Sequence, residues 1–269
     1  GMLTFLEAYD AVPFAGMPGW TVAAVIGIYV FSFFVRGAAG FGSAMPAVLL
    51  SSWLMPAHHA VILALLAGLV SQAQFLAQGV RGADWVVARS VVFALMISIT
   101  AGVLLFERLD ADWLLLLLGL ICMALVTVVR PPMVDRFVTV WGSGAGIVAG
   151  AISGFVGTVV GAGGMYLLVV YLRHVCTLPA RLRATNIVVS AVFLAWRAFV
   201  AALAGLISLQ FLSEVVLLVP AIVFGGWLGG RWFRSLDPVR FAQFLQVILS
   251  IASLGLVVRG GLRILSNAG

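Results

Sequence analysis

Gly37-Ala38-Ala39-Gly40-Phe41-Gly42 and Gly157-Thr158-Val159-Val160-Gly161-Ala162-Gly163-Gly164 are two glycine-rich stretches that interrupt long apolar segments. A short apolar run and a proline follow each of them, Pro56 after the first and Pro179 after the second. Unwound backbone at membrane depth persists only where protein or a water-filled cavity surrounds it, and in repeat-built membrane proteins it lies near binding sites. These stretches therefore predict a duplicated membrane protein with two broken helices.

Matched features at nearly constant spacing indicate the duplication. The matched pairs are Gly40-Phe41-Gly42 with Gly161-Ala162-Gly163, Pro56-Ala57 with Pro179-Ala180, and Gly102 and Leu109-Asp110 with Gly229 and Leu236-Asp237. The spacing grows from 121 to 123 to 127 residues, as small loop insertions would produce. The alternative is that the glycines only permit close packing of membrane helices.

The composition excludes a soluble globular protein. The chain is 64% hydrophobic and 9% charged, with a mean hydropathy of +1.21. We expect one membrane domain over residues 1–269, with repeat one at 20–130 and repeat two at 138–259. The net charge of +6 comes from arginines scattered through short loops, because the chain has no lysine, and this favours membrane topology over nucleic-acid binding. The two cysteines form no metal-ligand spacing, and neither a metal nor a cofactor is expected.

Ten apolar segments are predicted, at 20–36, 43–54, 58–78, 86–105, 113–129, 138–156, 164–172, 184–204, 214–230 and 241–258. The second and the seventh are too short to span, since twelve helical residues extend about 18 Å and the hydrocarbon core is about 30 Å thick. Each half is therefore expected to begin with a re-entrant hairpin bent at its glycine break. Three single crossings follow each hairpin, which gives an all-α polytopic protein.

Arginine counting supports the hairpins. If both turn back, ten loop arginines lie on one side of the membrane and three on the other, whereas merged long helices give seven and six. Only the first split satisfies the positive-inside rule. An odd number of single crossings per half makes the repeats inverted, places both termini outside a bacterial-type inner membrane, and lets the glycine tips approach each other.

Two arginines fall outside the loops, Arg36 beside the first glycine break and Arg197 within segment 184–204. Each costs about 2.5 to 3.5 kcal/mol at a helix centre, so each needs a partner. All nine acidic residues lie in the N-terminal tail, in loops or at segment ends. The missing counter-charge is therefore expected to be an anionic substrate. The alternatives are that Arg197 snorkels to lipid headgroups and that Arg36 caps backbone carbonyls.

Polar residues follow one stripe of segment 184–204. Asn186, Ser190 and Arg197 lie at i, i+4 and i+11, which the helical period places on one face. The matching helix carries Ser71, Gln74 and Gln78, and the spacing of 123 pairs Gln74 with Arg197. The alternative is ordinary hydrogen bonding between helices, worth about 0.6 kcal/mol on average in membranes.

The half-helices that start near Ser43 and Gly164 would direct free backbone N–H groups and a partial positive charge toward an anion. The predicted binding residues at the two tips are Gly40, Gly42, Ser43, Thr158, Gly161, Gly163 and Gly164. His58-His59 begins a predicted helix near the outer face, where a solvated or capping role is the default and proton coupling is the alternative.

The sequence resembles the sulfite exporter TauE/SafE family, also called the toluene-sulfonate uptake permeases. The resemblance rests on Gly-Ala-Ala-Gly-Phe-Gly with Pro56, on Gly-Ala-Gly-Gly at 161–164 with Pro179 and Asn186, and on the duplicated layout. Ala38, Ala39 and Phe41 stand where members of the family often carry a fuller run of glycines. The resemblance implies a membrane carrier, and an exporter by direction, for small sulfur-containing anions such as sulfite and organosulfonates.

Three function classes are open at this point. The first is a secondary carrier of a small sulfur or organic oxyanion. Its expected partners are the anion and membrane lipid, and a homodimer is possible. An anion channel could use the same residues. An intramembrane enzyme is disfavoured, because HExxH, paired membrane aspartates and a Gly-x-Ser-x-Gly context are all missing from the sequence.

Overall fold

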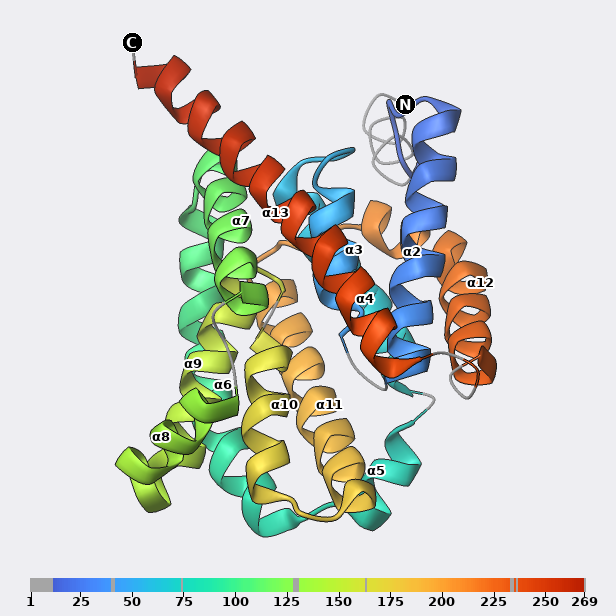
Figure 1. Cartoon of the computed structure of the whole chain (residues 1–269). Helices are drawn as coiled ribbons and strands as arrows, with labels where there is room; N and C mark the ends of the chain where they lie inside the picture. Colours follow the sequence, from blue (N-terminus) through green and yellow to red (C-terminus); the bar gives the residue numbers. More distant parts are fainter. Residues whose placement is uncertain are drawn as a thin grey trace.

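A computed structural model describes residues 12–39, 42–73, 75–127, 131–162, 164–232, 235 and 237–268. All regular secondary structure in these ranges is helical (Figure 1), which confirms the all-α fold class. The helices are α2 (Gly19–Ala39), α3 (Ala44–Ser51), α4 (Ala57–Ala73), α5 (Leu76–Gly82), α6 (Trp85–Arg108), α7 (Ala111–Thr127), α8 (Pro131–Trp141), the 3-10 turn η1 (Gly142–Gly144), α9 (Ala145–Val159), α10 (Gly164–Val175), α11 (Pro179–Leu203), α12 (Leu209–Trp232) and α13 (Pro238–Ala268).

Six stretches of the described chain are long and apolar enough to cross a membrane. They are Gly19–Ala38, Trp85–Arg108, Asp135–Val159, Pro179–Leu203, Leu209–Trp232 and Val239–Asn267. Helices α4 and α7 have 17 residues each. At 1.5 Å per residue they extend about 26 Å, close to the lower limit for a crossing.

The two segments predicted to be too short to span are short helices. Helix α3 has 8 residues and α10 has 12. The helices before them are longer, because α2 has 21 residues and α9 has 15, the latter preceded by α8 and the η1 turn. Each broken element thus pairs one long helix with one short returning helix.

One end of the bundle gathers the starts of α2, α4 and α12, and we call it the α2 end. The backbone N–H of Phe14, just before α2, donates to Glu214 on α12 at 2.9 Å. His59 in the first turn of α4 contacts the same carboxylate at 2.5 Å. Since α4 follows α3 by only five residues, α3 must return to the end from which α2 begins.

The opposite end, which we call the α6 end, gathers the starts of α6 and α11. The N–H of Asp84 donates to Thr185 Oγ1 at 2.9 Å, and Arg181 lies 3.8 Å from the Asp84 carboxylate. Helix α10 returns to this end, because His174 in its last turn lies 3.0 Å from Asp135 on α8. The α2–α3 and α9–α10 hairpins therefore open at opposite ends of the bundle.

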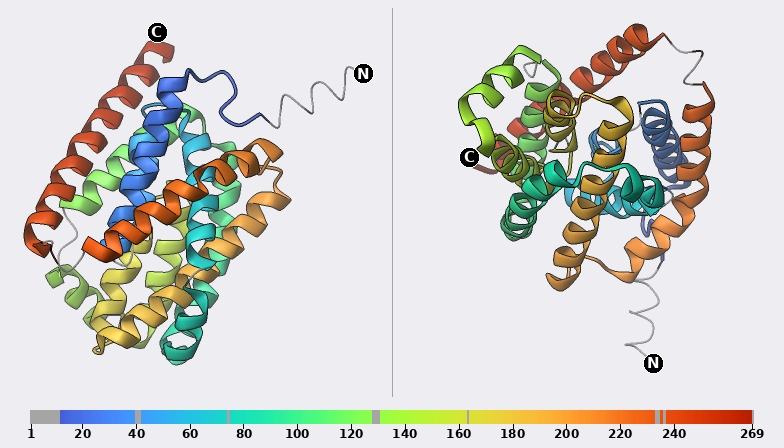
Figure 2. Two further views of the ribbon diagram at one scale, coloured as in Figure 1. Left: turned by 90° about the vertical axis from the view of Figure 1, so that its right-hand side faces the viewer. Right: turned by 90° about the horizontal axis from the view of Figure 1, so that it is seen from below.

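The two halves of the chain interlock through glycine-lined helix contacts. Helix α2 packs against α12 from the other half, α9 packs against α6, and α7 packs against α13 (Figures 1 and 2). Gly229 on α12 lies against the Phe34 and Ala38 backbone of α2, and Gly150 on α9 lies against the Val91 backbone of α6. Close packing is the role that the alternative interpretation gave to glycine, and it holds for these helix-interior positions.

Several boundaries differ from the predicted segments. Segment 58–78 is divided, since α4 ends at Ala73 and α5 begins at Leu76. The predicted end at residue 258 is wrong, because α13 continues to Ala268. Arg259 was expected to lie in a loop, but it donates to the carbonyl oxygens of Ser52 and Trp53, and the next residue, Gly260, packs against the Leu116 backbone of α7.

Candidate functional site

Arg197 lies inside the protein rather than at its surface. Its side chain on α11 is 3% exposed, and Nη2 donates to the Thr158 carbonyl oxygen at 2.9 Å. Thr158 lies in the last turn of α9, where carbonyl groups lack intrahelical partners and the helix dipole is negative. The guanidinium group therefore caps α9 at the second glycine break. This is not the arrangement expected of an arginine that snorkels to headgroups.

The hydrogen-bond partners of Arg36 are neutral polar groups. Its Nη2 donates to Oε1 of Gln72, which is buried on α4, and Gln72 Nε2 donates to the Ile187 carbonyl oxygen on α11 at 2.7 Å. These bonds join α2, α4 and α11. Among the described residues, Arg36 and Arg197 form no ion pair, so their acceptors satisfy N–H groups without cancelling charge.

The two guanidinium groups are held at different depths. Through Gln72, Arg36 is linked to the Ile187 carbonyl oxygen on α11, and Arg197 lies ten residues further along the same helix. At 1.5 Å per residue, these backbone positions are about 15 Å apart. Asn186 is buried beside the first level, and Ser190 is half-buried between the two. The predicted stripe on α11 thus connects two cationic levels.

Several buried polar atoms near these levels have no hydrogen-bond partner among the described residues. They include Asn186 Oδ1 on α11, and Thr158 Oγ1 and Ser153 Oγ on α9. An unsatisfied buried polar group costs about 1 to 3 kcal/mol. Such groups are expected where a ligand or water completes the hydrogen bonding.

The glycine tips have the backbone geometry that their residue types suggest. Gly42 has φ +91° and Gly161 has φ +74°, a region that disfavours side chains. Gly164 begins α10 against Gly157 and Ser153 of α9, so that the hairpin closes backbone to backbone. Ser43 is buried at the start of α3, and its side chain makes no capping hydrogen bond. Gly40, Gly163 and Gln74 lie outside the described residues.

Replacing Gly161 with alanine is expected to destabilise the folded protein. The new Cβ would adopt a left-handed conformation and lie 2.5 Å from Val61 Cγ1 on α4. Left-handed strain of about 1–2 kcal/mol and overpacking of about 1–3 kcal/mol both oppose the substitution. Gly42 is the matched control, because its Cβ would have nothing within 4 Å and only the strain would apply. Thermal unfolding in detergent should rank Gly161→Ala well below Gly42→Ala, and equal melting temperatures would contradict the clash with Val61.

Comparison with protein families decides the classification. The family model for the sulfite exporter TauE/SafE matches residues 24–256, most of the chain. The chain belongs to this family. The TauE/SafE match covers both glycine breaks, Arg36 and Arg197, and it establishes an integral membrane protein of a sulfite- or sulfonate-exporter type. A search of curated proteins and one of solved structures gave no significant match.

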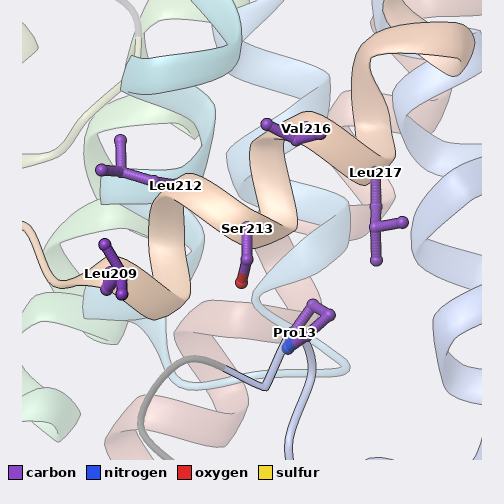
Figure 3. Close-up of a pocket in the computed structure, with 6 residues that line it drawn as sticks. All are labelled: Pro13, Leu209, Leu212, Ser213, Val216 and Leu217. Atoms are coloured by element: carbon purple, nitrogen blue, oxygen red, sulfur yellow. The ribbon is translucent and has the colours of Figure 1, made fainter. Parts of the chain in front are cut away.

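One hollow on this TauE/SafE protein is not suited to an anion. It has a volume of about 430 Å³ and lies at the start of α12, beside the segment that precedes α2 (Figure 3). Its lining residues are Pro13, Leu209, Leu212, Ser213, Val216 and Leu217. The lining holds no charge, and its only side-chain polar atom, Ser213 Oγ, donates to the Gln210 carbonyl oxygen. An apolar hollow of this kind does not stabilise an oxyanion.

Sequence reasoning missed two polar residues of this TauE/SafE chain. Gln72 was passed over for the stripe of Ser71, Gln74 and Gln78, although the need of Arg36 for a nearby acceptor was a signal for it. Glu214 was placed at a segment end, yet its side chain is fully buried. Its partners Phe14 and His59 are far away in the sequence, so no local pattern could reveal that burial.

Proposed function

We propose that this chain is a secondary carrier that moves small sulfur-containing or organic anions, such as sulfite or organosulfonates, across the membrane. The observation that carries the proposal is a pair of membrane-depth guanidinium groups, Arg36 and Arg197, whose acceptors among the described residues are neutral. The TauE/SafE family supplies the substrate class. No catalytic step is needed for this activity.

Electrostatics favours an anion as the missing partner. Two uncompensated cations within a membrane protein are costly, at about 2.5 to 3.5 kcal/mol each on insertion scales. A sulfite or sulfonate group carries several acceptor oxygens, which match the planar donor fork of arginine. Thr158 Oγ1 could donate a further hydrogen bond. We expect Arg36 and Arg197 to act at two levels of one path, with Asn186 and Ser190 between them.

The arrangement of the hairpins supports inverted repeats as the basis of transport. Hairpins that open at opposite ends, and crosswise packing of α2 on α12 and of α9 on α6, are what an inverted duplication predicts. In repeat-built transporters, one part rocks against the other around a central site, which exposes that site to each side in turn. The glycine tips, Gly40 and Gly42 in the first half and Gly161, Gly163 and Gly164 in the second, would border that site.

Arginine placement supports an orientation with the α6 end in the cytoplasm and both chain ends outside. The α6 end carries Arg81, Arg89, Arg136, Arg173, Arg181, Arg183, Arg231 and Arg240, and the α2 end carries Arg108, Arg259 and Arg263. A bacterial-type inner membrane is the setting that we propose. Export then corresponds to movement from the α6 end to the α2 end.

Counterflow in proteoliposomes tests the proposal. Vesicles loaded with unlabelled sulfite should accumulate labelled sulfite through the wild-type protein, and the rate should saturate. Arg36→Gln removes the charge but keeps a polar side chain at this position, so we expect a tenfold or greater loss of transport rate at low sulfite, on the order of one charged hydrogen bond. Arg89→Gln, at an exposed arginine, is the matched control.

Each outcome of this assay has a distinct meaning. Saturable counterflow that requires Arg36 supports the carrier and its site. Non-saturating, electrically conducted flux would establish an anion channel instead. Counterflow that is unchanged in Arg36→Gln would remove Arg36 from the path. The proposed function would be overturned if the protein moved neither sulfite nor any sulfonate tested.

A further inference from the structure

Glu214 is the only acidic side chain that is buried among the described residues. Its Oε1 accepts hydrogen bonds from the Phe14 N–H and from Gln210 Nε2, both at 2.9 Å. Its Oε2 lies 2.5 Å from His59 Nε2. A buried carboxylate that has two donors and an imidazole nitrogen beside it is suited to bind a proton, and protonation weakens its charge-assisted hydrogen bonds.

His59 connects this carboxylate to solvent. Its side chain is 17% exposed, whereas that of Glu214 is fully buried. The imidazole ring also packs on Phe211 of α12, with ring centroids 4.5 Å apart. His59 is therefore the more accessible of the two groups to a proton from water at the α2 end.

Other titratable groups at this end are directed elsewhere. His58 lies against Phe106 on α6, with Nε2 3.3 Å from its carbonyl oxygen. Asp112 on α7 pairs with Arg263 on α13 at 3.6 Å. From α2, Tyr29 is the one titratable group within electrostatic reach of Glu214. Of the remaining charged side chains that the structure describes at this end, Glu107, Arg108 and Asp110 are exposed, and Arg259 donates to the Ser52 and Trp53 carbonyl oxygens.

The hydrogen bond from Phe14 links the Glu214 carboxylate to the conformation of the turn before α2. Phe14 is buried and has φ +53°, which is uncommon for a residue with a side chain. Its N–H is held by Glu214. If the carboxylate loses its charge, this bond weakens, and the strained turn before α2 is no longer held against α12.

Helix α2 extends from this carboxylate toward the proposed anion path. Tyr29, Phe33 and Arg36 lie at i, i+4 and i+7, on one face of the helix. Tyr29 and Phe33 are buried with their rings stacked, and the Tyr29 hydroxyl has no hydrogen-bond partner among the described residues. A shift of α2 at Phe14 can therefore be transmitted along a packed face to Arg36.

We propose that Glu214 and His59 form a proton-binding site that couples anion transport to proton movement. The coupling rests on the proposed carrier function, whereas the proton site stands on its own geometry. The proton comes from water at the α2 end, is held between Nε2 of His59 and Oε2 of Glu214, and returns to water on release. Only N–H and O–H bonds form and break. Proton binding releases the Phe14 turn, and α2 conveys that change to the anion path.

Hydrogen exchange tests the proton site without any anion. The hydrogen-bonded amides of Phe14 and Met17 in purified wild-type protein should lose at least about tenfold protection from about pH 8 to about pH 5, after correction for intrinsic exchange. Glu214→Gln keeps the shape but not the charge, so its protection should be low and independent of pH. Glu107→Gln, an exposed carboxylate at the same end, should behave as wild type.

A second variant separates the two partners. His59→Gln retains the carboxylate and its hold on Phe14, so protection at high pH should persist while the response to pH shrinks. Constant protection in the wild type, or the wild-type response in Glu214→Gln, would overturn the proton site. A full response in His59→Gln would exclude His59 from it.

Proteoliposomes containing an internal pH-sensitive dye test the coupling. Methanesulfonate is the anion used, because it stays ionised and therefore carries no proton itself, and Glu214→Gln vesicles measure any proton leak through the lipid. Wild-type protein should change the internal pH as the anion moves, and Glu214→Gln should move the anion without that change. Anion flux with no pH change in the wild type would refute coupling. If no anion moves at all, the carrier function fails, while hydrogen exchange still decides the proton site.

Discussion

Replacing Gly229 with alanine is expected to lower the melting temperature of the purified protein far more than replacing Gly226 on the same helix. A Cβ at Gly229 would overlap the Phe34 carbonyl oxygen and lie 2.9 Å from the Ala38 nitrogen, both backbone atoms of α2. Backbone cannot rotate aside as a side chain can, so α2 and α12 must separate. Overpacking of this kind costs about 1–3 kcal/mol for one added methyl group.

Gly226 makes this comparison sharp. Its added Cβ would have nothing within 4 Å, so alanine there changes helix propensity without a clash. Thermal unfolding of both variants in the same detergent measures the difference. If Gly229→Ala unfolded at the wild-type temperature, the close contact between α2 and α12 would not exist in the membrane protein.

Replacing Arg197 is expected to have the largest effect on transport. Arg197→Gln removes the positive charge but keeps a polar side chain, which is two bonds shorter than the Nη2 that donates to the Thr158 carbonyl oxygen. A hydrogen bond to a charged group is worth about 1.5–3 kcal/mol, which corresponds to roughly 10- to 100-fold weaker anion affinity. Arg197→Lys keeps the charge without the planar fork, and it should fall between glutamine and the wild type.

The half-saturation concentration for sulfite in counterflow measures this effect, with Arg89→Gln as the exposed control. Melting temperatures measured in parallel separate binding from folding. A lowered melting temperature with unchanged half-saturation in Arg197→Gln would mean that Arg197 only caps α9.

Hydropathy and glycine placement predicted the helical class and the two short returning helices. Segment lengths were sufficient for this, because a helix of 8 or 12 residues is too short to cross the hydrocarbon core. The burial of Arg197 and Asn186 followed from their helical spacing on an apolar segment. Segment length and helical spacing are local patterns, so they can be recognised within a single helix of the sequence.

The features that were missed depend on partners far away in the sequence. Glu214 begins the predicted segment 214–230, where an acid is ordinarily solvated, but α12 starts earlier, at Leu209, and the Phe14 turn and His59 cover the carboxylate. The need of Arg36 for an acceptor pointed to a polar residue nearby, but only the folded chain shows that Gln72 is that acceptor rather than one of its neighbours. Arg259 was expected in a loop because a charge ordinarily ends an apolar segment, and its contact with the carbonyl groups after α3 cannot be read from a single segment.

The crosswise packing of the halves also constrains how the protein is made. Helix α2 is synthesised near the beginning of the chain, but its glycine-lined partner α12 leaves the ribosome only after nearly all the other helices. The nascent first half therefore enters the bilayer with one face of α2 unmatched. Assembly must wait for the last helices, and a polypeptide truncated after α7 becomes a substrate for membrane quality control rather than a stable folding unit.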